Sequence, residues 1–218
     1  MSDFNFFQVL NALIKAVQWT AILSLIAFAG GGIVGMTFTM MRISDNKVLK
    51  RIAQFYISFF QGTPLLTQLF LIFFGIPIVL GFDVPAIVSA SVAMTFYASA
   101  YLADIWRGSI ESIPKTQWEA GESLGLSWLE QFRLVILPQA VKISIPPTIG
   151  FLVQVIKNTS LTSIIGYVEL TRRGQILNNV TFQPFLIFSM VGVIYFIVCY
   201  PLSVYSQRLE KKLTIESR

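Results

Sequence analysis

Apolar runs long enough to cross a bilayer follow one another along most of this 218-residue chain. Apolar side chains make up 55% of the residues and charged ones only 12%, with a mean hydropathy of +0.69. A soluble domain of this size carries more polar surface, whereas crossing the hydrocarbon takes roughly 20 mostly apolar residues per helix. The sequence therefore predicts an all-α, polytopic membrane helix bundle with about five transmembrane helices, forming a single domain over residues 1–218.

The expected spans are separated by polar, glycine-containing or proline-containing segments. They lie at about residues 19–41, 52–79, 86–105, 143–156 and 185–205. The second contains the interruption Gln61-Gly62-Thr63-Pro64, and the fourth contains Pro146-Pro147; proline has no backbone N–H to donate, so it weakens a helix. Ahead of the first span, residues 1–19 lack a basic start and a small-residue cleavage site. We expect an amphipathic helix along the membrane surface there, and no cleavable signal peptide.

Basic residues set the expected orientation, because cytoplasmic loops near span ends are enriched in Lys and Arg. The loop at 42–51, the segment at 107–142 and the tail hold four basic residues each, twelve of the sixteen in the chain. Placing all three in the cytoplasm requires an odd number of spans, with a periplasmic N-terminus and a cytoplasmic C-terminus. The exceptions are Lys15, Lys157, Arg172 and Arg173. We expect the arginine pair to face the periplasm, as a solvated loop or against an acidic partner or anionic substrate.

The residue inventory argues against an enzyme. There is no histidine, the single Cys199 lies in an apolar run, and no GxxxxGK[ST] phosphate loop occurs. We therefore expect no catalytic residue, no metal site and no cofactor in this chain. The net charge of +5 lies in short clusters between apolar runs, which is typical of topology signals, so we expect no nucleic-acid partner.

The longest polar segment, about 108–138, contains two helix-start patterns. Thr116-Gln117-Trp118-Glu119 and Ser127-Trp128-Leu129-Glu130 each match a capping box. Gly125 lies between them and suits the left-handed turn that ends a helix. We expect a helix, a glycine turn and a second helix that reaches Pro138. On physical grounds alone, this pair either docks on a soluble partner or lies on the lipid headgroups.

The same segment resembles the EAA loop of ABC-importer permeases. The run Glu119-Ala120-Gly121, then Gly125, then Val135-Ile136-Leu137-Pro138 has the spacing of that motif throughout. Gly121 replaces the second alanine of the motif, and Val135 replaces its isoleucine. The stretches that begin at Gly62, Ser99 and Lys157 resemble the polar amino acid permeases of the same superfamily.

This resemblance implies a type I ABC-importer transmembrane domain in the bacterial inner membrane. The loop would form the coupling helix that fits a cytoplasmic ATP-binding subunit, which holds the ATP and Mg. A periplasmic binding protein would deliver a polar amino acid, and an identical or paralogous second permease subunit would complete the pathway among membrane lipids. The residues expected to couple to the ATPase are Glu119, Ala120, Gly121, Gly125, Leu137 and Pro138.

Polar residues within or beside the apolar runs are the candidates for the substrate path, because such groups usually line a cavity or interface. They are Gln61, Thr63, Lys157, Asn158, Thr159, Ser160 and Glu169. The hydroxyls and amide of 157–160 suit the α-amino and α-carboxylate groups of an amino acid, or else cap a helix end near the periplasm. For Gln61 and Thr63 the alternative is a packing kink. Because Asn158 is neutral, we expect no acidic partner for an exclusively cationic substrate unless Glu169 supplies it.

Two other transport functions remain open at this point. One is a permease of the same superfamily for a different small solute, since the binding protein partly sets the solute. The other is an ion-driven secondary transporter, which usually shows internal repeats or several intramembrane carboxylates. Here only Asp104 and Glu169 come near the apolar runs, and no convincing repeat is present.

Overall fold

The computed structural model describes residues 6–216, which are helical almost throughout and contain no strand. The chain termini, including Arg218 of the basic tail, lie outside the described residues. The elements are α1 (Phe6–Ile43), α2 (Lys47–Gly62), α3 (Leu65–Leu80), α4 (Ala86–Glu111), α5 (Lys115–Ser123), α6 (Trp128–Gln131), the π-helical turn η1 (Phe132–Ile136), α7 (Leu137–Asn158), the 3₁₀ segment η2 (Thr159–Ile165), α8 (Leu170–Thr181) and α9 (Pro184–Glu216).

The predicted number of spans is confirmed over the described residues. Four helical stretches are long and apolar enough to cross a membrane: Phe6–Ile43, Ala86–Glu111, Trp128–Ile165 and Pro184–Leu213. The pair formed by α2 and α3 is bent by 100° at its break and makes a fifth span if it is counted as one. The predicted interruption at Pro64 is therefore a sharp corner between two helices.

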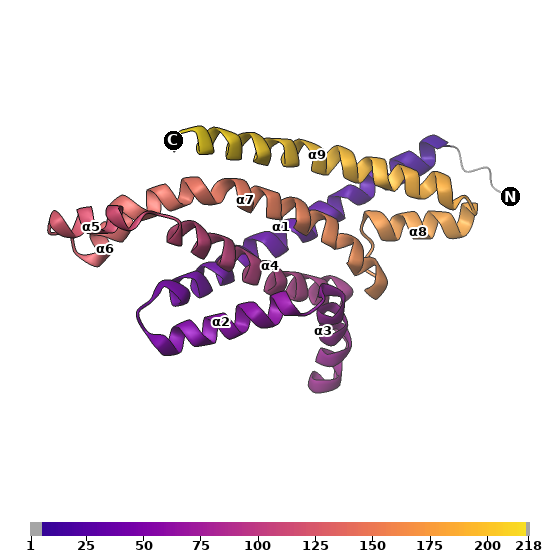
Figure 1. Cartoon of the computed structure of the whole chain (residues 1–218). Coiled ribbons are helices and arrows are strands. Elements are labelled where there is room, and N and C mark those ends of the chain that lie inside the picture. Colours follow the sequence, from indigo (N-terminus) through magenta and orange to yellow (C-terminus); the bar gives the residue numbers. More distant parts are fainter. Residues whose placement is uncertain (1–5, 217–218) are drawn as a thin grey trace.

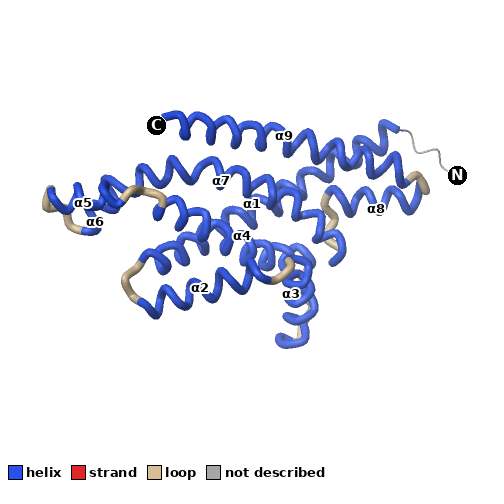
Figure 2. The backbone as a smooth tube through the Cα atoms, viewed as in Figure 1, coloured by secondary structure: helices blue, strands red, loops and turns tan. Residues whose placement is uncertain are grey.

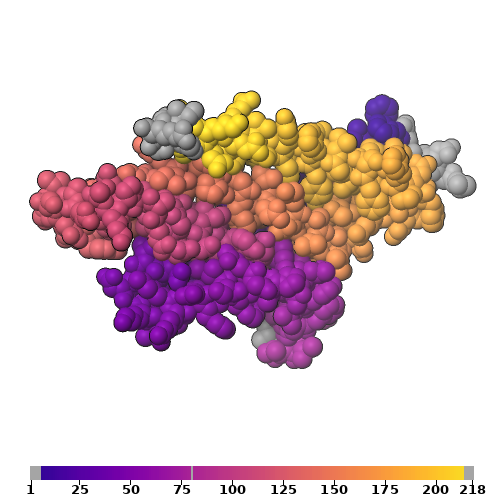
Figure 3. All heavy atoms as spheres, viewed as in Figure 1, coloured from indigo at the N-terminus to yellow at the C-terminus, as the bar shows by residue number. Residues whose placement is uncertain are grey.

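The long helices form a bundle with distinct ends (Figures 1 and 2). Helices α5 and α6 project from one end, and α8 lies at the other, near the start of α1. The space-filling view shows the projection clear of the α2–α3 region below it (Figure 3). Helix α9 runs beside α7 and brings the described C-terminal end toward the projecting helices. The bundle thus separates a projecting end from an end closed by α8.

The N-terminal segment differs from the expected surface helix. It continues without a break into the first span as the 38-residue helix α1. Val9 and Leu13 are buried and pack with Leu170 of α8 and Ile187 of α9. Of the apolar face that predicted contact with the membrane surface, Leu13 is buried, Leu10 and Val17 are half-buried and Phe6 is 48% exposed. The prediction of a separate surface helix is wrong because this segment is part of α1; residues 1–5 of the predicted helix lie outside the described residues.

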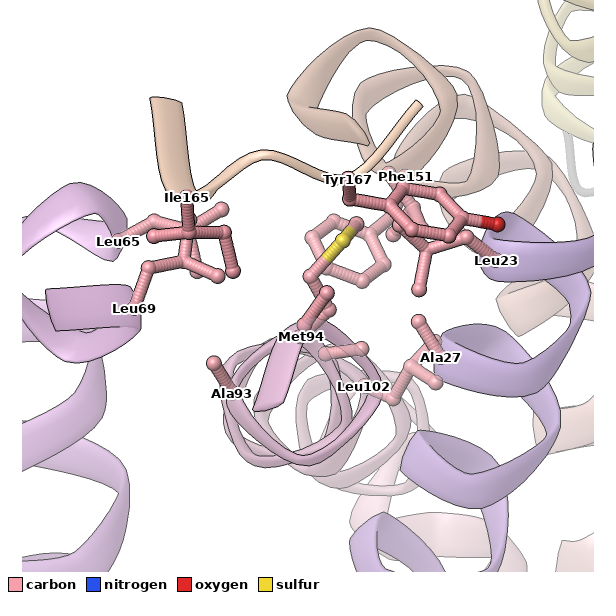
Figure 4. Packing of buried hydrophobic residues seen from close by; sticks show 13 residues of the cluster. Leu23, Ala27, Leu65, Leu69, Ala93, Met94, Leu102, Phe151, Ile165 and Tyr167 are labelled. Atoms are coloured by element: carbon pink, nitrogen blue, oxygen red, sulfur yellow. The ribbon is translucent and has the colours of Figure 1, made fainter. Parts of the chain in front are cut away.

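The main core lies where α1, α3, α4, α7 and η2 converge (Figure 4). Leu23 and Ala27 from α1 face Met94 and Leu102 from α4 in this cluster, and Phe151 of α7 packs against them. Ile165, the last residue of η2, and Tyr167, just after it, complete the cluster. This core fixes α7 against α4, the two helices that carry the polar groups described below.

Two glycines let α1 and α4 approach closely. A Cβ atom on Gly31 would lie 2.6 Å from the Cβ of Ala98, and one on Gly35 would lie 2.9 Å from the Ser99 carbonyl oxygen. Real Cβ contacts are longer, so an added methyl group forces the helices apart. A Cβ on Gly32, one residue along, meets only the Trp106 ring at 3.7 Å. Gly31 and Gly35 thus give α1 a thin face toward α4.

Replacing Gly31 by alanine is expected to lower stability by about 1–3 kcal/mol, the usual cost of overpacking a well-filled core. Gly32→Ala is the matched control and should be neutral or slightly stabilising, since alanine favours helix over glycine by roughly 0.5–1 kcal/mol. Thermal unfolding of the two purified variants in the same detergent measures the difference. Equal melting temperatures would show that the α1–α4 contact is looser than described.

Candidate functional site

The projecting helices α5 and α6 form a compact knob, residues 115–131, attached to the bundle by an apolar base. Ile110, Ile113, Phe132 and Ile136 are buried together beneath it, with Trp118 of α5 packed against them. Residues from the end of α4, the connection to α5 and the π-helical turn η1 thus hold the knob in place.

One of the two predicted capping boxes is present. The Ser127 backbone N–H donates to Glu130 Oε2 at 2.9 Å, and the Ser127 hydroxyl donates to the same oxygen at 2.6 Å. The Glu130 N–H in turn faces Ser127 Oγ, completing the box. The box predicted at Thr116 is wrong, because the N-cap of α5 is Pro114, two residues earlier, and the helix begins at Lys115. Pro114 precedes it with φ −56°, a value suited to a helix start.

Gly125 makes the turn between the two helices, as predicted. Its φ is +72°, a left-handed conformation that glycine adopts without strain. The Leu126 N–H reaches back to the Gly121 carbonyl at 3.1 Å, and the Gly125 N–H donates to the Glu122 carbonyl at 2.9 Å. This is the hydrogen-bond pattern of a glycine-terminated helix. The turn folds α6 back beside α5.

Gly121 has a structural reason for differing from the alanine of the EAA pattern. It is buried, and a Cβ there would lie 2.7 Å from Nε2 of Gln131. The buried Gln131 side chain crosses this position to donate a hydrogen bond to the Trp118 carbonyl oxygen. Gln131 was not among the predicted residues, because its role depends on a contact between the two helices. Gly121 therefore shapes the knob from inside.

The tip of the knob presents apolar and acidic side chains to the outside. Leu124 is 78% exposed, Leu129 65% and Trp128 50%, and Glu119 and Ala120 are exposed beside them. An apolar cluster with acidic neighbours, held on a rigid projection, is the usual character of a protein docking surface. Since the knob projects beyond the end of the bundle (Figure 1), its tip is presented away from the membrane-spanning helices. The geometry favours docking on a soluble partner over lying on headgroups.

Pro138 does not end the helix. A continuous helical stretch runs from Trp128 to Ile165, and Pro138 falls in the first turn of α7, directly after the π-helical turn η1. Proline cannot donate to the carbonyl four residues back, and a π turn accommodates that loss. Leu137 is half-buried and Pro138 is exposed at this point. Helix α6 of the knob and the fourth span are therefore parts of one long helical stretch.

The far end of that stretch carries the predicted 157–160 run. Thr159 is fully buried, and its hydroxyl donates to the Ile156 carbonyl at 2.8 Å; the Ser160 hydroxyl donates to the Lys157 carbonyl at 2.7 Å. These two hydroxyls are thus bonded to their own helix, as the helix-end alternative expects. Lys157 is exposed and Asn158 half-buried, so these two side chains keep polar groups available.

Asn158 faces an aromatic wall that the sequence did not single out. The Tyr97 hydroxyl of α4 interacts with the Asn158 side chain and with the Tyr101 hydroxyl. The ring centroids of Tyr97 and Tyr101 are 4.7 Å apart, and Tyr101 stacks on Phe151 of α7 at 5.3 Å. Gln154 donates to Asn158 Oδ1 at 3.3 Å from one turn earlier. The stretch beginning at Ser99 pointed to α4, but not to Tyr97.

The corner between α2 and α3 is braced by a buried glutamine. Gln68 Nε2 donates to the carbonyls of Phe60 at 2.9 Å and Thr63 at 3.1 Å, and to the Thr63 hydroxyl at 2.9 Å. The Thr63 hydroxyl itself donates to the Phe59 carbonyl at 2.8 Å. These bonds satisfy backbone groups freed by Pro64 and favour the packing-kink interpretation for Thr63. Gln61 is half-buried, and its substrate role stays a prediction.

Glu169 is the N-terminal cap of α8. It is fully buried; its Oε1 accepts the Arg172 N–H at 2.8 Å, and Oε2 accepts the Thr171 N–H at 2.9 Å and the Tyr195 hydroxyl at 2.7 Å. Burial raises the pKa of the Glu169 carboxyl, and these hydrogen bonds oppose that rise. In this conformation Glu169 offers no free oxygen to a substrate.

Replacing Glu169 by alanine is expected to destabilise the chain by about 1–3 kcal/mol. The change removes a helix cap and leaves buried donors without acceptors. Asp83→Ala, which removes an exposed acid in the α3–α4 loop, is the control and should leave the melting temperature unchanged. Thermal unfolding of both variants tests the assignment. A Glu169→Ala protein as stable as the control would contradict it.

The described residues offer no group of three or more His, Cys, Asp or Glu side chains that could hold a metal ion. The predicted site residues lie in four places: the knob with the start of α7, the end of α7 and the start of η2, the α2–α3 corner with Gln61 and Thr63, and the cap of α8 with Glu169. Asp104 bonds to Arg107 at 2.7 Å on α4 and lies in none of these places. The helical stretch Trp128–Ile165 connects α6, at the docking surface, with the polar residues around Asn158 that face the aromatic wall.

Residues 31–215 match the family described as "Binding-protein-dependent transport system inner membrane component". A Bacillus subtilis protein named "Probable amino-acid ABC transporter permease protein YckA" is 34% identical over 92% of this chain and 88% of its own length. The L-cystine transport system permease protein TcyB of the same organism is 34% identical over 96% and 88%. A crystal structure described as an amino acid ABC transporter with histidines superposes with a TM-score of 0.87 at 32% identity, covering 93% of this chain and 94% of that one.

Proposed function

The chain belongs to the family of inner-membrane components of binding-protein-dependent transport systems, and from that premise we propose that it moves a polar amino acid across the bacterial inner membrane. It is the permease subunit of an ABC importer, with the whole of residues 1–218 acting as one transmembrane domain. The relatives named for amino-acid and cystine transport support this substrate class. Its N-terminus faces the periplasm and its C-terminus the cytoplasm, as the distribution of basic residues predicts.

One observation supports the mechanism: α6, the second helix of the knob, and the polar stretch around Asn158 belong to a single helical run, Trp128–Ile165. A cytoplasmic ATP-binding subunit, which binds the ATP and Mg, docks on the tip of the knob at Glu119, Ala120 and Leu124. Closure of that subunit moves α7 as a lever, because the apolar base under the knob ties α7 to α4. The chain itself contributes no cofactor and no catalytic residue.

The substrate path runs along the face shared by α4 and α7. Asn158 and Gln154 offer amide donors and acceptors for the α-carboxylate and α-amino groups, and Tyr97 and Tyr101 form an apolar wall with a polar edge. Lys157, exposed one residue before Asn158, favours the carboxylate end. The neutral character of Asn158, together with a Glu169 whose oxygens are committed to α8, argues against a strictly cationic substrate. A second permease subunit faces this wall from across the pathway.

The test is a panel of binding-protein ligands. The chain is reconstituted in proteoliposomes with its ATP-binding subunit and its periplasmic binding protein, and ATP hydrolysis is measured with cystine, glutamine, glutamate, arginine or no ligand. We expect at least one of these amino acids to stimulate hydrolysis through the binding protein. Stimulation by another class of small solute, with none of the amino acids active, would make the chain a permease for that solute instead.

A further inference from the structure

A pocket with a basic lining lies at the end of the bundle opposite the knob. Its volume is about 610 Å³, and it is bounded by α1, the start of α4 and the turn that leads into α8. Lys15 of α1 and Arg173 of α8 both line it, although they are far apart in sequence. None of its lining residues in the described part of the chain is acidic. The fold therefore gathers two of the four cations that depart from the charge pattern of the sequence.

The wall between these two cations is fixed by hydrogen bonds. The Tyr167 hydroxyl donates to the Trp19 carbonyl at 3.1 Å, and the Leu170 N–H donates to the Thr20 hydroxyl at 3.2 Å. Gly166, with φ +87°, makes the tight turn that brings this wall against α1. The pocket is thus held open by the same contacts that anchor α8.

The nearby polar groups do not neutralise the two cations. Glu169 adjoins the wall, but its oxygens accept hydrogen bonds from α8 and Tyr195. Asp83 is exposed in the α3–α4 loop and does not line the pocket. Within residues 6–216, neither Lys15 nor Arg173 takes part in an ion pair. The pocket has an unmatched positive charge that suits an anionic ligand.

The position of the pocket along α1 matches the headgroup layer of a membrane. Lys15 precedes Arg42 on α1 by about 27 residues, roughly 40 Å along a helix at ~1.5 Å per residue. A bilayer measures about 40–45 Å with its headgroups, so the two cations lie at opposite surfaces. Trp19, 42% exposed one turn from Lys15, is the residue type that favours this interface.

An apolar track runs from the pocket toward the membrane interior. Ile22 and Ile26 follow Lys15 and Trp19 at helical spacing and are 39% and 41% exposed. These four residues share one face of α1. Lysine and arginine place their apolar stems along such a surface while their charged ends reach a phosphate.

We propose that this pocket binds the headgroup of an anionic phospholipid, with the phosphate between Lys15 and Arg173 and an acyl chain along Trp19, Ile22 and Ile26. Binding would tie the start of α1 to α8 and so steady the end of the bundle opposite the knob. The proposed lipid site does not depend on which solute the chain transports, because none of its residues lies on the α4–α7 path.

Native mass spectrometry of the full chain, titrated with phosphatidylglycerol or with phosphatidylcholine of the same acyl length, tests the proposal. Wild type should retain phosphatidylglycerol in preference to phosphatidylcholine. The double variant Lys15→Gln/Arg173→Gln should bind phosphatidylglycerol at least tenfold more weakly. Arg172→Gln is the matched control and should behave as wild type, since Arg172 bonds to Gln175 and does not line the pocket.

Two further arms separate the possible ligands. The charge-preserving variant Lys15→Arg/Arg173→Lys should retain the lipid, which shows that any loss in the glutamine variant is one of charge and not of folding. Millimolar inorganic phosphate should not displace the lipid; full displacement would make this a site for a free anion. Equal phosphatidylglycerol affinity in wild type and the glutamine variant overturns the proposal. So does a variant that keeps the lipid but loses affinity for the binding protein, which would assign the pocket to an acidic protein partner.

Discussion

Replacing Leu124 by aspartate is expected to abolish stimulation of ATP hydrolysis by the binding protein. Leu124 is the most exposed apolar side chain of the knob, at 78%. Burying a leucine on docking contributes about 1.5–3 kcal/mol, and an unpaired carboxylate in its place adds a further penalty. A combined loss above about 3 kcal/mol weakens assembly by more than roughly 100-fold. ATPase assays on reconstituted complexes, with co-purification of the ATP-binding subunit, measure both effects.

Leu124→Met is the matched control, because it keeps an apolar side chain of similar size at the same place. It should assemble and respond nearly as wild type does. The aspartate variant should also unfold at the wild-type temperature, since its side chain is exposed in the isolated chain. An aspartate variant that assembles and is stimulated like wild type would exclude the knob tip as the docking surface.

Replacing Asn158 by alanine is expected to reduce amino-acid uptake about tenfold to a hundredfold while the complex still assembles. The amide is the polar group of α7 that meets the Tyr97–Tyr101 wall. Removing it leaves a charged group of the substrate without a partner in a poorly solvated site, at about 1–3 kcal/mol. Uptake of labelled amino acid into proteoliposomes, measured over a range of substrate concentrations, gives the change.

Ser160→Ala serves as the control, because the Ser160 hydroxyl is bonded to the Lys157 carbonyl of its own helix. Its uptake should stay within about twofold of wild type, a change of about 0.4 kcal/mol in binding. The substrate path would have to lie elsewhere if Asn158→Ala transported normally. Strict selectivity for lysine or arginine that vanished in Asn158→Ala would contradict the inference that this subunit supplies no acidic partner.

Features governed by neighbouring residues were predicted well from the sequence. Ser127 and Glu130 form their capping box within one helical turn, and Gly125 adopts the turn that its position between two helices requires. Pro64 marks the corner between α2 and α3, because a missing N–H disrupts a helix wherever it falls. The count of spans followed from apolar length alone. Each of these depends on fewer than about 30 consecutive residues.

Features that depend on distant contacts were predicted less well. The Thr116 box failed because Pro114 caps α5 two residues before Thr116, so one local helix-start signal replaced another. The burial of Glu169 requires α9 to bring Tyr195 beside it, and Gly121 is small because Gln131 folds over it from the next helix. Tyr97 looks like any aromatic of an apolar span until α7 places Asn158 opposite. No local spacing pattern in the sequence indicates these contacts between distant residues.

Uptake of a labelled polar amino acid into proteoliposomes that contain the chain, its ATP-binding subunit and a second permease subunit tests the central claim most directly. ATP is supplied on the side of the ATP-binding subunit and the loaded binding protein on the other. We predict uptake that requires ATP and the binding protein together and that ignores imposed proton or sodium gradients. Uptake by the chain alone, driven by such a gradient and indifferent to ATP, would contradict the account and make the protein a secondary transporter.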